Sequence, residues 1–380
     1  MNDTLTFEKF KLYYLNLPSL QQAGFFLWPS LAGDKLTNEE IHLLKEIKPS
    51  GIIFFKRNLS SMEQAKDLIV QIRNCIENKK EPFFKPLVTS IDEEGGRVSR
   101  LPIANIRGKS ALEFANNHDK DGLKQQILNQ CTAAKQIGIN CLLAPVADIL
   151  TEPKNTVMGD RCFGYDAHTV SEYVTLVNRA ILNEKLLSCA KHFPGHGNTL
   201  TDSHKEFSVS NVTLDALKNR EWLPFKKLIS EGIPFIMAAH VLLPQVDANN
   251  PATLSYKILT SHLKEELGFK GLILSDDLRM NAIALHYKVT KAQESSITEE
   301  IGPAASPMGS PRDDNGQQDD EYLKQASIDA LNAGCDILLS CQSIEKEFII
   351  AQSIAVKLRD DKNFREKMLE KAWRIYSVLK

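Results

Sequence analysis

The stretch GLILSDD, residues 271–277, indicates how this chain folds. Its first four residues are apolar without alternation, which is typical of a parallel strand that is buried on both faces. The run GIIFF at residues 51–55 has the same character. Short apolar runs of this kind recur along the whole chain, at residues 24–28, 51–55, 87–91, 141–146, 188–192, 234–239, 271–275 and 335–339.

The segments between these runs have helical periodicity. Residues 37–47 open with Thr37 and Glu40 in capping-box spacing and place Leu44 and Ile47 on one helical face. Alternating strands and helices predict a parallel sheet. A doubly wound sheet would need fewer strands and a Gly-rich phosphate loop after the first, whereas the first run here is followed by WPSLAG. We therefore predict an α/β fold consisting of a single (β/α)8 TIM-type barrel.

One segment interrupts the alternation of strands and helices. Residues 287–320 are rich in Ser, Pro, Gly and charge, and they contain too few apolar residues to order themselves by burial. We expect a disordered insertion here, after the seventh strand. No room is left for a second folded domain, so residues 1–380 are expected to form one catalytic domain.

Composition and charge exclude several classes of protein. The chain has 46 Lys and Arg against 48 Asp and Glu, a net charge of −2, so a strongly basic nucleic-acid surface is not expected. No apolar run approaches the roughly 20 residues of a membrane helix, and the first residues lack the pattern of a signal peptide. The seven cysteines are scattered without a C-x-x-C pair, which indicates neither a disulfide framework nor a cysteine zinc site. We expect a cytoplasmic protein without nucleic-acid or membrane partners.

Charged residues follow five consecutive predicted strands. Because barrel enzymes carry their catalytic groups where strands end and the next loops begin, these side chains are expected to gather at one rim. So many strand ends with charge favour an active site over chance loop charges. The residues are Asp92, Glu93, Glu94 and Arg97 after the third strand, Asp148 after the fourth, Lys191 and His192 at the fifth, His240 after the sixth, and Asp276 and Asp277 at the seventh.

The densest polar segment is KHFPGHGNTLTDSH at residues 191–204. Its proline and glycines predict that the strand breaks sharply into a long loop that ends near Asp202 and His204. An Asp two residues before a His can orient the ring and support its charged form, as a general acid/base near neutral pH requires. The same spacing also fits a capping Asp beside an exposed His.

Three segments in order resemble the signature of family 3 glycoside hydrolases of the β-N-acetylglucosaminidase type, bacterial enzymes of cell-wall recycling. They are IDEEGGRVSR at residues 91–100, KHFPGHGNTLTDSH at 191–204 and SDDLRM at 275–280. PSGIIFFKRN, APVADI, GDRCFG and NAGCDILL match as well. The resemblance therefore covers nearly the whole predicted barrel.

The resemblance implies an exo-acting, retaining β-N-acetylhexosaminidase. By motif, Asp276 would be the nucleophile that forms a covalent glycosyl-enzyme, and His204 the general acid/base with Asp202 as its partner. The residues that would bind the N-acetylglucosamine are Asp92, Arg100, Arg161, Lys191 and His192.

The implied substrates are muropeptide fragments, in which N-acetylglucosamine is β-1,4-linked to anhydro-N-acetylmuramic acid. No cofactor and no metal are implied, and the family suggests a monomer. Chemistry agrees with these roles, because glycoside cleavage needs a proton on the leaving oxygen and a carboxylate at the anomeric carbon. A cation such as Lys191 beside Asp276 would favour the ionised carboxylate.

Alternative functions stay open at this point. The chain could be an N-acetylglucosaminide phosphorylase or a hexosaminidase of chitooligosaccharides. A non-catalytic sugar binder is disfavoured because binding alone needs no nucleophile. A metal-dependent barrel hydrolase would draw its ligands from His192, His196, His204, His240, Asp92 and Asp276.

Overall fold

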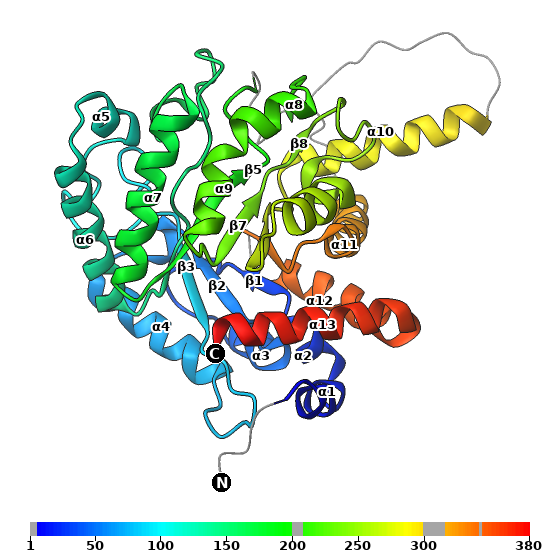
Figure 1. Ribbon diagram of the computed structural model, residues 1–380. Helices are drawn as coiled ribbons and strands as arrows, with labels where there is room; N and C mark the ends of the chain where they lie inside the picture. The colour runs from blue at the N-terminus through cyan, green and yellow to red at the C-terminus, as the bar shows by residue number, and fades with distance from the viewer. Residues whose placement is uncertain (1–5, 200–207, 299–315, 342–343) are drawn as a thin grey trace.

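Eight parallel strands form a nearly closed barrel in the computed structural model, which describes residues 6–199, 208–298, 316–341 and 344–380 (Figure 1). The strands lie in the order β1-β10-β9-β7-β5-β4-β3-β2, and the two end strands, β1 and β2, contact one another. The predicted (β/α)8 barrel is therefore confirmed. The strands are β1 (Leu27–Pro29), β2 (Gly51–Phe54), β3 (Val88–Ile91), β4 (Cys141–Leu142), β5 (Leu187–Phe193), β7 (Phe235–Ala238), β9 (Leu272–Asp277) and β10 (Ile337–Ser340).

Helices surround the barrel and connect its strands (Figure 1). The α-helices are α1 (Phe7–Leu15), α2 (Ser19–Gly24), α3 (Asn38–Ile47), α4 (Met62–Ile76), α5 (Ala111–Asn116), α6 (Lys120–Ile137), α7 (Ala167–Asn183), α8 (Leu214–Ala216), α9 (Leu223–Ser230), α10 (Asn281–Thr298), α11 (Gly316–Ala333), α12 (Ile344–Asp360) and α13 (Lys362–Leu379). Two π-helical segments, Leu217–Glu221 and Lys257–Glu266, and short 3-10 turns complete the connections. A separate pair of short strands, β6 (Ser208–Val209) and β8 (Val241–Leu242), lies outside the barrel sheet.

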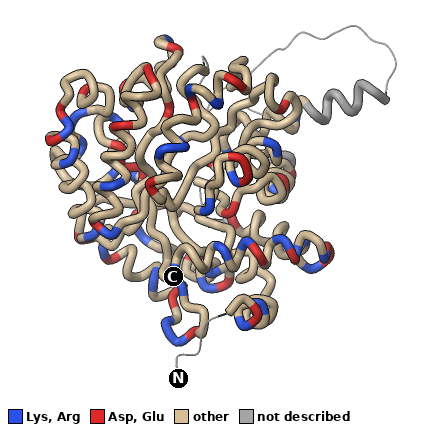
Figure 2. Tube along the Cα trace, viewed as in Figure 1, with Lys and Arg blue, Asp and Glu red and all other residues tan. Residues whose placement is uncertain are grey.

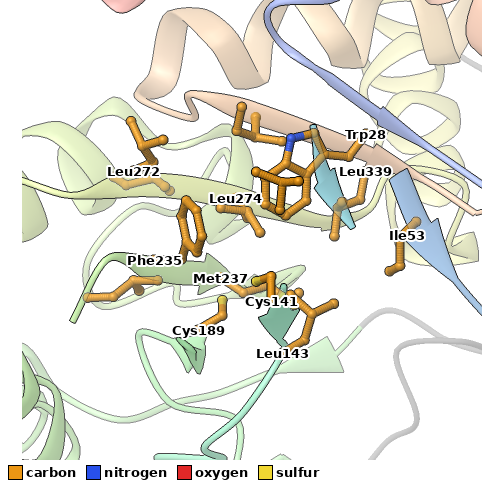
Figure 3. Close-up of a cluster of buried hydrophobic side chains, with 14 of the residues drawn as sticks. Trp28, Ile53, Cys141, Leu143, Cys189, Phe235, Met237, Leu272, Leu274 and Leu339 are labelled. Atoms are coloured by element: carbon orange, nitrogen blue, oxygen red, sulfur yellow. The ribbon is translucent and has the colours of Figure 1, made fainter. Parts of the chain in front are cut away.

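Apolar side chains from the strands fill the barrel interior (Figure 3). Trp28 is fully buried, packs edge-on against Phe235 at 5.4 Å between ring centroids, and donates its indole N–H to Ser50 Oγ at 2.9 Å. This large ring explains the glycine at position 51, because a Cβ there would lie 2.6 Å from the indole. The interior is thus a packed core, as in other barrels of eight strands.

The first strand begins later than the sequence predicted. We expected a strand at residues 24–28, but α2 continues to Gly24 and β1 starts at Leu27. Gly24 ends the helix where it meets the end of α3, and a Cβ on it would lie 2.0 Å from the carbonyl oxygen of Ile47. The glycine therefore serves a close helix contact, which apolar periodicity does not reveal.

The capping box predicted at Thr37 is present at the start of α3. Thr37 Oγ1 accepts the backbone N–H of Glu40 at 3.0 Å, and Glu40 Oε2 accepts the backbone N–H of Thr37 at 2.8 Å. Leu44 and Ile47 are buried on the face that packs inward. The local prediction of this helix is therefore confirmed.

The insertion expected at residues 287–320 is partly helical, so that expectation was wrong at both of its ends. Helix α10 continues to Thr298 and extends beyond its neighbours in Figure 1, and α11 begins at Gly316. Residues 287–298 contain no Gly or Pro, and both residue types are concentrated at 302–316. Helix propensity therefore outweighs the polar composition up to Thr298. Residues 299–315 lie outside the described part of the chain.

Aromatic rings join the two ends of the chain beneath the barrel. Phe10 of α1 lies 5.2–6.0 Å, between ring centroids, from five other rings. These rings belong to Tyr14, Phe25, Phe83, Trp373 and Tyr376. The cluster holds α1 against α13, so both terminal helices close the end of the barrel opposite the strand C-termini.

A buried carboxylate at the start of β10 attaches α13 to the same end of the barrel. Asp336 is fully buried, and its carboxylate accepts the backbone N–H of Ile273 at 3.0 Å. It pairs with Lys264 at 3.1 Å, with Arg374 at 2.8 Å and, more distantly, with Lys371 at 3.7 Å. Burial opposes its ionisation, but these cations hold the pKa of Asp336 well below its usual range.

Replacing Asp336 by asparagine is expected to lower the free energy of unfolding by about 3 kcal/mol, because buried cations lose their counter-charge. Breaking a buried ion pair typically costs roughly 3–5 kcal/mol. We expect the lower end of this range, because the Arg374 side chain is 35% exposed and can be hydrated. Urea unfolding of the two proteins at neutral pH measures the difference. A variant as stable as the parent would show that the cluster contributes nothing to stability.

Figure 2 shows Lys and Arg interspersed with Asp and Glu along the described part of the chain. Among the described helices, none combines the length and apolar character needed to cross a membrane.

Candidate active site

A cavity of about 350 Å³ opens at the C-terminal ends of the barrel strands. Its floor is the top of the apolar barrel core, formed by Ile53, Leu143, Met237 and Leu339. Charged and polar side chains from the strand ends form its walls. They include Asp92, Glu94, Arg97, Arg100, Arg161, Lys191, His192, His196, Asp276 and Asp277.

A buried network of charges forms one wall of this cavity. Lys191, at the end of β5, lies with Nζ 2.7 Å from Asp92 Oδ1 and 2.6 Å from Glu94 Oε1. Arg161 forms a bidentate pair with the same Glu94: its Nε donates to Oε2 at 2.8 Å and its Nη2 donates to Oε1 at 2.9 Å. The Lys191 side chain is only 2% exposed, so these partners replace its water.

The network fixes the charge state of its members. Burial disfavours ionisation of Glu94, but Arg161 and Lys191 outweigh it and hold the pKa of Glu94 well below its usual range. Burial likewise opposes the charge on Lys191, and Asp92 and Glu94 raise its pKa above the usual value. Lys191 thus makes ion pairs with both Asp92 and Glu94.

The neighbouring Glu93 faces away from the cavity. It is 1% exposed and accepts hydrogen bonds from Ser99 Oγ at 2.6 Å, from the backbone N–H groups of Arg100 and Leu101 at 2.8 and 3.0 Å, and from Gln130 at 3.1 Å. Burial raises its pKa. Glu93 fixes the loop after β3 so that Arg100 lines the cavity. Within the described part of the chain the Arg100 guanidinium has no ion-pair partner, which leaves it available to a ligand.

Asp148, after β4, holds the end of β5 and the start of the loop that follows it. Its Oδ2 accepts the ring Nδ1–H and the backbone N–H of His192 at 2.8 and 3.0 Å, and its Oδ1 accepts the backbone N–H of His196 at 2.6 Å. Burial would raise its pKa, but His192 and His196 hold the pKa of Asp148 below its usual range.

His196 is a buried, neutral histidine in the cavity wall. Its Nδ1 lies 2.8 Å from Thr199 Oγ1. Burial, followed by the nearby His192, lowers its pKa to about 4, so the ring stays uncharged at neutral pH. This histidine is suited to shaping the wall of the cavity.

Asp276 and Asp277 end β9 and differ in their surroundings. Asp277 Oδ1 accepts the backbone N–H groups of Arg279 and Cys341, each at 3.1 Å, and burial raises its pKa. Both carboxylates line the cavity and are partly buried, and Asp276 accepts the backbone N–H of Asp277 through Oδ1 at 2.8 Å. Two backbone N–H groups thus hold the Asp277 carboxylate in place.

His240 supports β9 beneath the site. It is 1% exposed, and its ring nitrogens lie 2.8 Å from Thr253 Oγ1 and 2.9 Å from the carbonyl oxygen of Asp277. Among the described residues, no group of three or more His, Cys, Asp or Glu side chains is arranged to hold a metal ion.

The structure brings most of the predicted site residues together. Asp276 and all five residues predicted to bind the sugar line one cavity; the five are Asp92, Arg100, Arg161, Lys191 and His192. The predicted acid/base pair, Asp202 and His204, lies outside the described residues. Sequence reasoning placed Glu94 and Asp148 among the charged residues at the strand ends but gave neither a specific role.

A nearly closed barrel with a cavity of charged side chains at its strand C-termini is typical of barrel enzymes that act on small polar molecules. Residues 10–300 match the family described as Glycosyl hydrolase family 3 N terminal domain. The chain belongs to glycosyl hydrolase family 3. The family resemblance read from the sequence is thereby confirmed, as is the prediction of a glycoside hydrolase.

Known proteins similar to this chain agree with the family. A beta-hexosaminidase from Methylobacillus flagellatus is 30% identical over 322 residues, which covers 83% of this chain and 80% of that protein. Another from Neisseria gonorrhoeae is 34% identical over 268 residues, covering 66% and 69%.

Two solved structures have the same architecture. A family 3 β-N-acetylglucosaminidase from Paenibacillus sp. matches 95% of this chain with a TM-score of 0.77 at 27% identity, and the match spans 63% of that longer protein. NagZ from Neisseria gonorrhoeae matches 93% of this chain and 98% of its own length with a TM-score of 0.68 at 25% identity.

Proposed function

We propose that this protein is an exo-acting, retaining β-N-acetylglucosaminidase. The observation that carries the proposal is the placement of Asp276 in one small cavity with Asp92, Arg100 and the buried Lys191 network. A cavity of about 350 Å³ is at the small end of ligand pockets and suits a single sugar ring, which favours removal of terminal sugars. The names of its relatives, beta-hexosaminidase and β-N-acetylglucosaminidase, support N-acetylglucosamine as that sugar.

The proposed reaction has two steps with retention of configuration. The Asp276 carboxylate attacks the anomeric carbon while the bond to the leaving oxygen breaks, and His204 donates its proton to that oxygen. Water then attacks the glycosyl-enzyme, His204 takes the water proton, and Asp276 is released. Asp202 would orient the His204 ring and stabilise its charged form. Asp92, Arg100, Arg161, Lys191 and His192 would hold the sugar or orient the groups that do.

We further propose muropeptide fragments as the substrates and cell-wall recycling in the cytoplasm as the role. Support for the substrate comes from the motifs at residues 91–100, 191–204 and 275–280. Support for the compartment comes from the cysteines, since all seven are free thiols, as is usual in reducing surroundings.

Hydrolysis of two aryl glycosides tests the proposed activity. The purified protein should cleave the aryl β-N-acetylglucosaminide and leave the aryl β-glucoside intact, with a chelator present and equally with or without phosphate. Dependence on phosphate would make the protein a phosphorylase, and loss of activity with chelator would make it a metal enzyme. Cleavage of neither glycoside would overturn the proposal. Comparing an anhydromuropeptide disaccharide with chitobiose then tests the natural substrate.

Replacing His204 by alanine should slow cleavage according to the leaving group. For the natural sugar leaving group we expect a loss of at least about 10²-fold in kcat/KM, because its oxygen must be protonated as it leaves. An aryl group that leaves as a stable anion needs no proton, so its kcat/KM should fall much less. Equal losses for both substrates would contradict the acid/base role of His204.

A further inference from the structure

Asp148 is a buried carboxylate at the site that lies behind His192 and does not line the cavity. Its side chain has no exposed surface, and both of its oxygens accept N–H groups, from His192 near the end of β5 and from His196 just after it. A charge is costly to bury unless it is hydrogen-bonded in this way. The arrangement indicates that Asp148 acts on the ligand through His192.

The bond to Asp148 determines which nitrogen of His192 carries a proton. An ionised carboxylate can only accept, so Nδ1, at 2.8 Å from Oδ2, must be the protonated nitrogen. The lowered pKa of Asp148 keeps that carboxylate ionised at neutral pH. Nε2 is then the ring nitrogen that remains for a ligand in the cavity, and in the neutral ring it is an acceptor.

The surroundings of the His192 ring are held by the same carboxylate. The backbone N–H of His192 is held by the same Asp148 oxygen at 3.0 Å, and the His196 ring lies edge-on against the His192 ring at 6.0 Å between centroids. Asp148 Oδ1 also holds the backbone of His196 at 2.6 Å. The Asp148 carboxylate thus binds the ring and the backbone of His192 and the backbone of His196.

The rest of the loop after β4 holds the same segment. A Cβ at Gly197 would lie 1.8 Å from the carbonyl oxygen of Ile149, so only glycine allows this approach. Glu152 donates its backbone N–H to the carbonyl oxygen of Gly197 at 3.1 Å, and Asn155 Nδ2 donates to that of His196 at 2.8 Å. Several contacts with the loop after β4 therefore fix the backbone that follows His192.

We propose that Asp148 is a positioning residue that fixes His192 as its Nδ1–H tautomer, so that Nε2 accepts a hydrogen bond from a hydroxyl of the bound sugar. This inference rests on the proposed function for the identity of the ligand. It adds to that function a defined hydrogen-bond pattern, in which a sugar hydroxyl donates to Nε2 of His192.

Replacing Asp148 by asparagine tests the proposal. Asparagine has one acceptor oxygen and one NH₂ group, so in either orientation it presents a donor to an N–H group of His192 or His196. We expect the affinity for N-acetylglucosamine, measured by calorimetry, to fall about 10- to 100-fold, as is typical when a carboxylate that orients a binding histidine is lost. Asp360→Asn, at the end of the outer helix α12 and paired with the exposed Arg359, is the control and should bind as the parent does.

A double-mutant cycle separates positioning from a purely structural role. If Asp148 acts through His192, then Asp148→Asn should weaken binding less than about threefold in a His192→Ala background. An equal loss in both backgrounds would overturn the proposal. Thermal unfolding of all four proteins checks that each is folded at the temperature of the measurement.

The tautomer can also be observed in the parent protein without any change to Asp148. Two-bond ¹⁵N–¹H spectra of histidine-labelled protein, assigned by the His192→Ala variant, should show a protonated Nδ1 and an unprotonated Nε2 when the ring is neutral. A protonated Nε2 would overturn the proposal. If the parent neither binds N-acetylglucosamine nor cleaves its glycosides, the proposed function fails. The spectrum then still shows whether the His192 ring beside Asp148 is the Nδ1–H tautomer.

Discussion

Replacing Asp276 by asparagine is expected to lower kcat by at least about 10⁴-fold, which corresponds to roughly 5.5 kcal/mol of transition-state stabilisation. Asparagine has nearly the same shape, but its neutral amide cannot form the glycosyl ester or oppose positive charge at the anomeric carbon. Asp276 lies near the end of β9 and is partly exposed, and we expect the isosteric variant to fold. The affinity for N-acetylglucosamine should change less than about threefold, or 0.7 kcal/mol.

Steady-state kinetics and calorimetry on the same preparation measure these two quantities. Asp329→Asn is a suitable control, because that carboxylate accepts hydrogen bonds from Tyr287 and Gln325 on the outer helices and carries the same charge. Its turnover should equal that of the parent. Normal turnover in Asp276→Asn would contradict the nucleophile assignment.

Replacing Glu94 by glutamine is expected to lower the free energy of unfolding by about 3–5 kcal/mol, because it removes the counter-charge of the buried Arg161 and leaves Lys191 with Asp92 alone. Lys191 and Arg161 are 2% and 15% exposed, so water cannot replace the lost carboxylate. Since both cations belong to the cavity wall, kcat/KM should also fall by at least about 10²-fold.

The stability effect should depend on pH with a defined sign. Burial opposes ionisation of Glu94, but Arg161 and Lys191 hold its folded pKa well below the value of about 4.3 of an unfolded chain. Its contribution is therefore complete above about pH 4.3 and is lost as the pH falls from there toward the folded pKa. Urea unfolding should show a gap between parent and variant that is constant at neutral pH and narrows in acid.

An exposed ion pair provides the matched control for Glu94. Lys120 and Glu172 form such a pair, with side chains 42% and 48% exposed. Glu172→Gln should change stability by no more than about 1 kcal/mol, as is usual for surface pairs. A loss for Glu94→Gln as small as this would contradict the view that the network is a buried support of the site.

The barrel could be predicted from the sequence because its signals are local. Runs such as GIIFF and GLILS are buried on both faces, and each of the eight predicted runs overlaps an observed strand. Residues at strand ends, among them Asp92, Lys191 and Asp276, gather at one rim because parallel strands all end there. Order along the chain is sufficient for that inference.

Partners distant in sequence could not be predicted in the same way. Glu93 and Glu94 are adjacent and identical in type, yet one pins a loop and the other pairs with Lys191, 97 positions away. Gly24 ends α2 because its backbone lies against Ile47 at the end of α3. Residues 287–298 are helical despite their polarity. Such outcomes depend on packing, which local composition does not contain. The roles of Asp202 and His204 remain predictions from their motif.

Trapping the glycosyl-enzyme tests the central claim most directly. Incubation with a 5-fluoro β-N-acetylglucosaminyl fluoride, which reacts readily but hydrolyses slowly, should load the protein with one sugar. Proteolysis and mass spectrometry should then place that sugar on Asp276, in the peptide that carries SDDLRM. A sugar attached to another residue, or turnover with inversion and no adduct, would contradict the account.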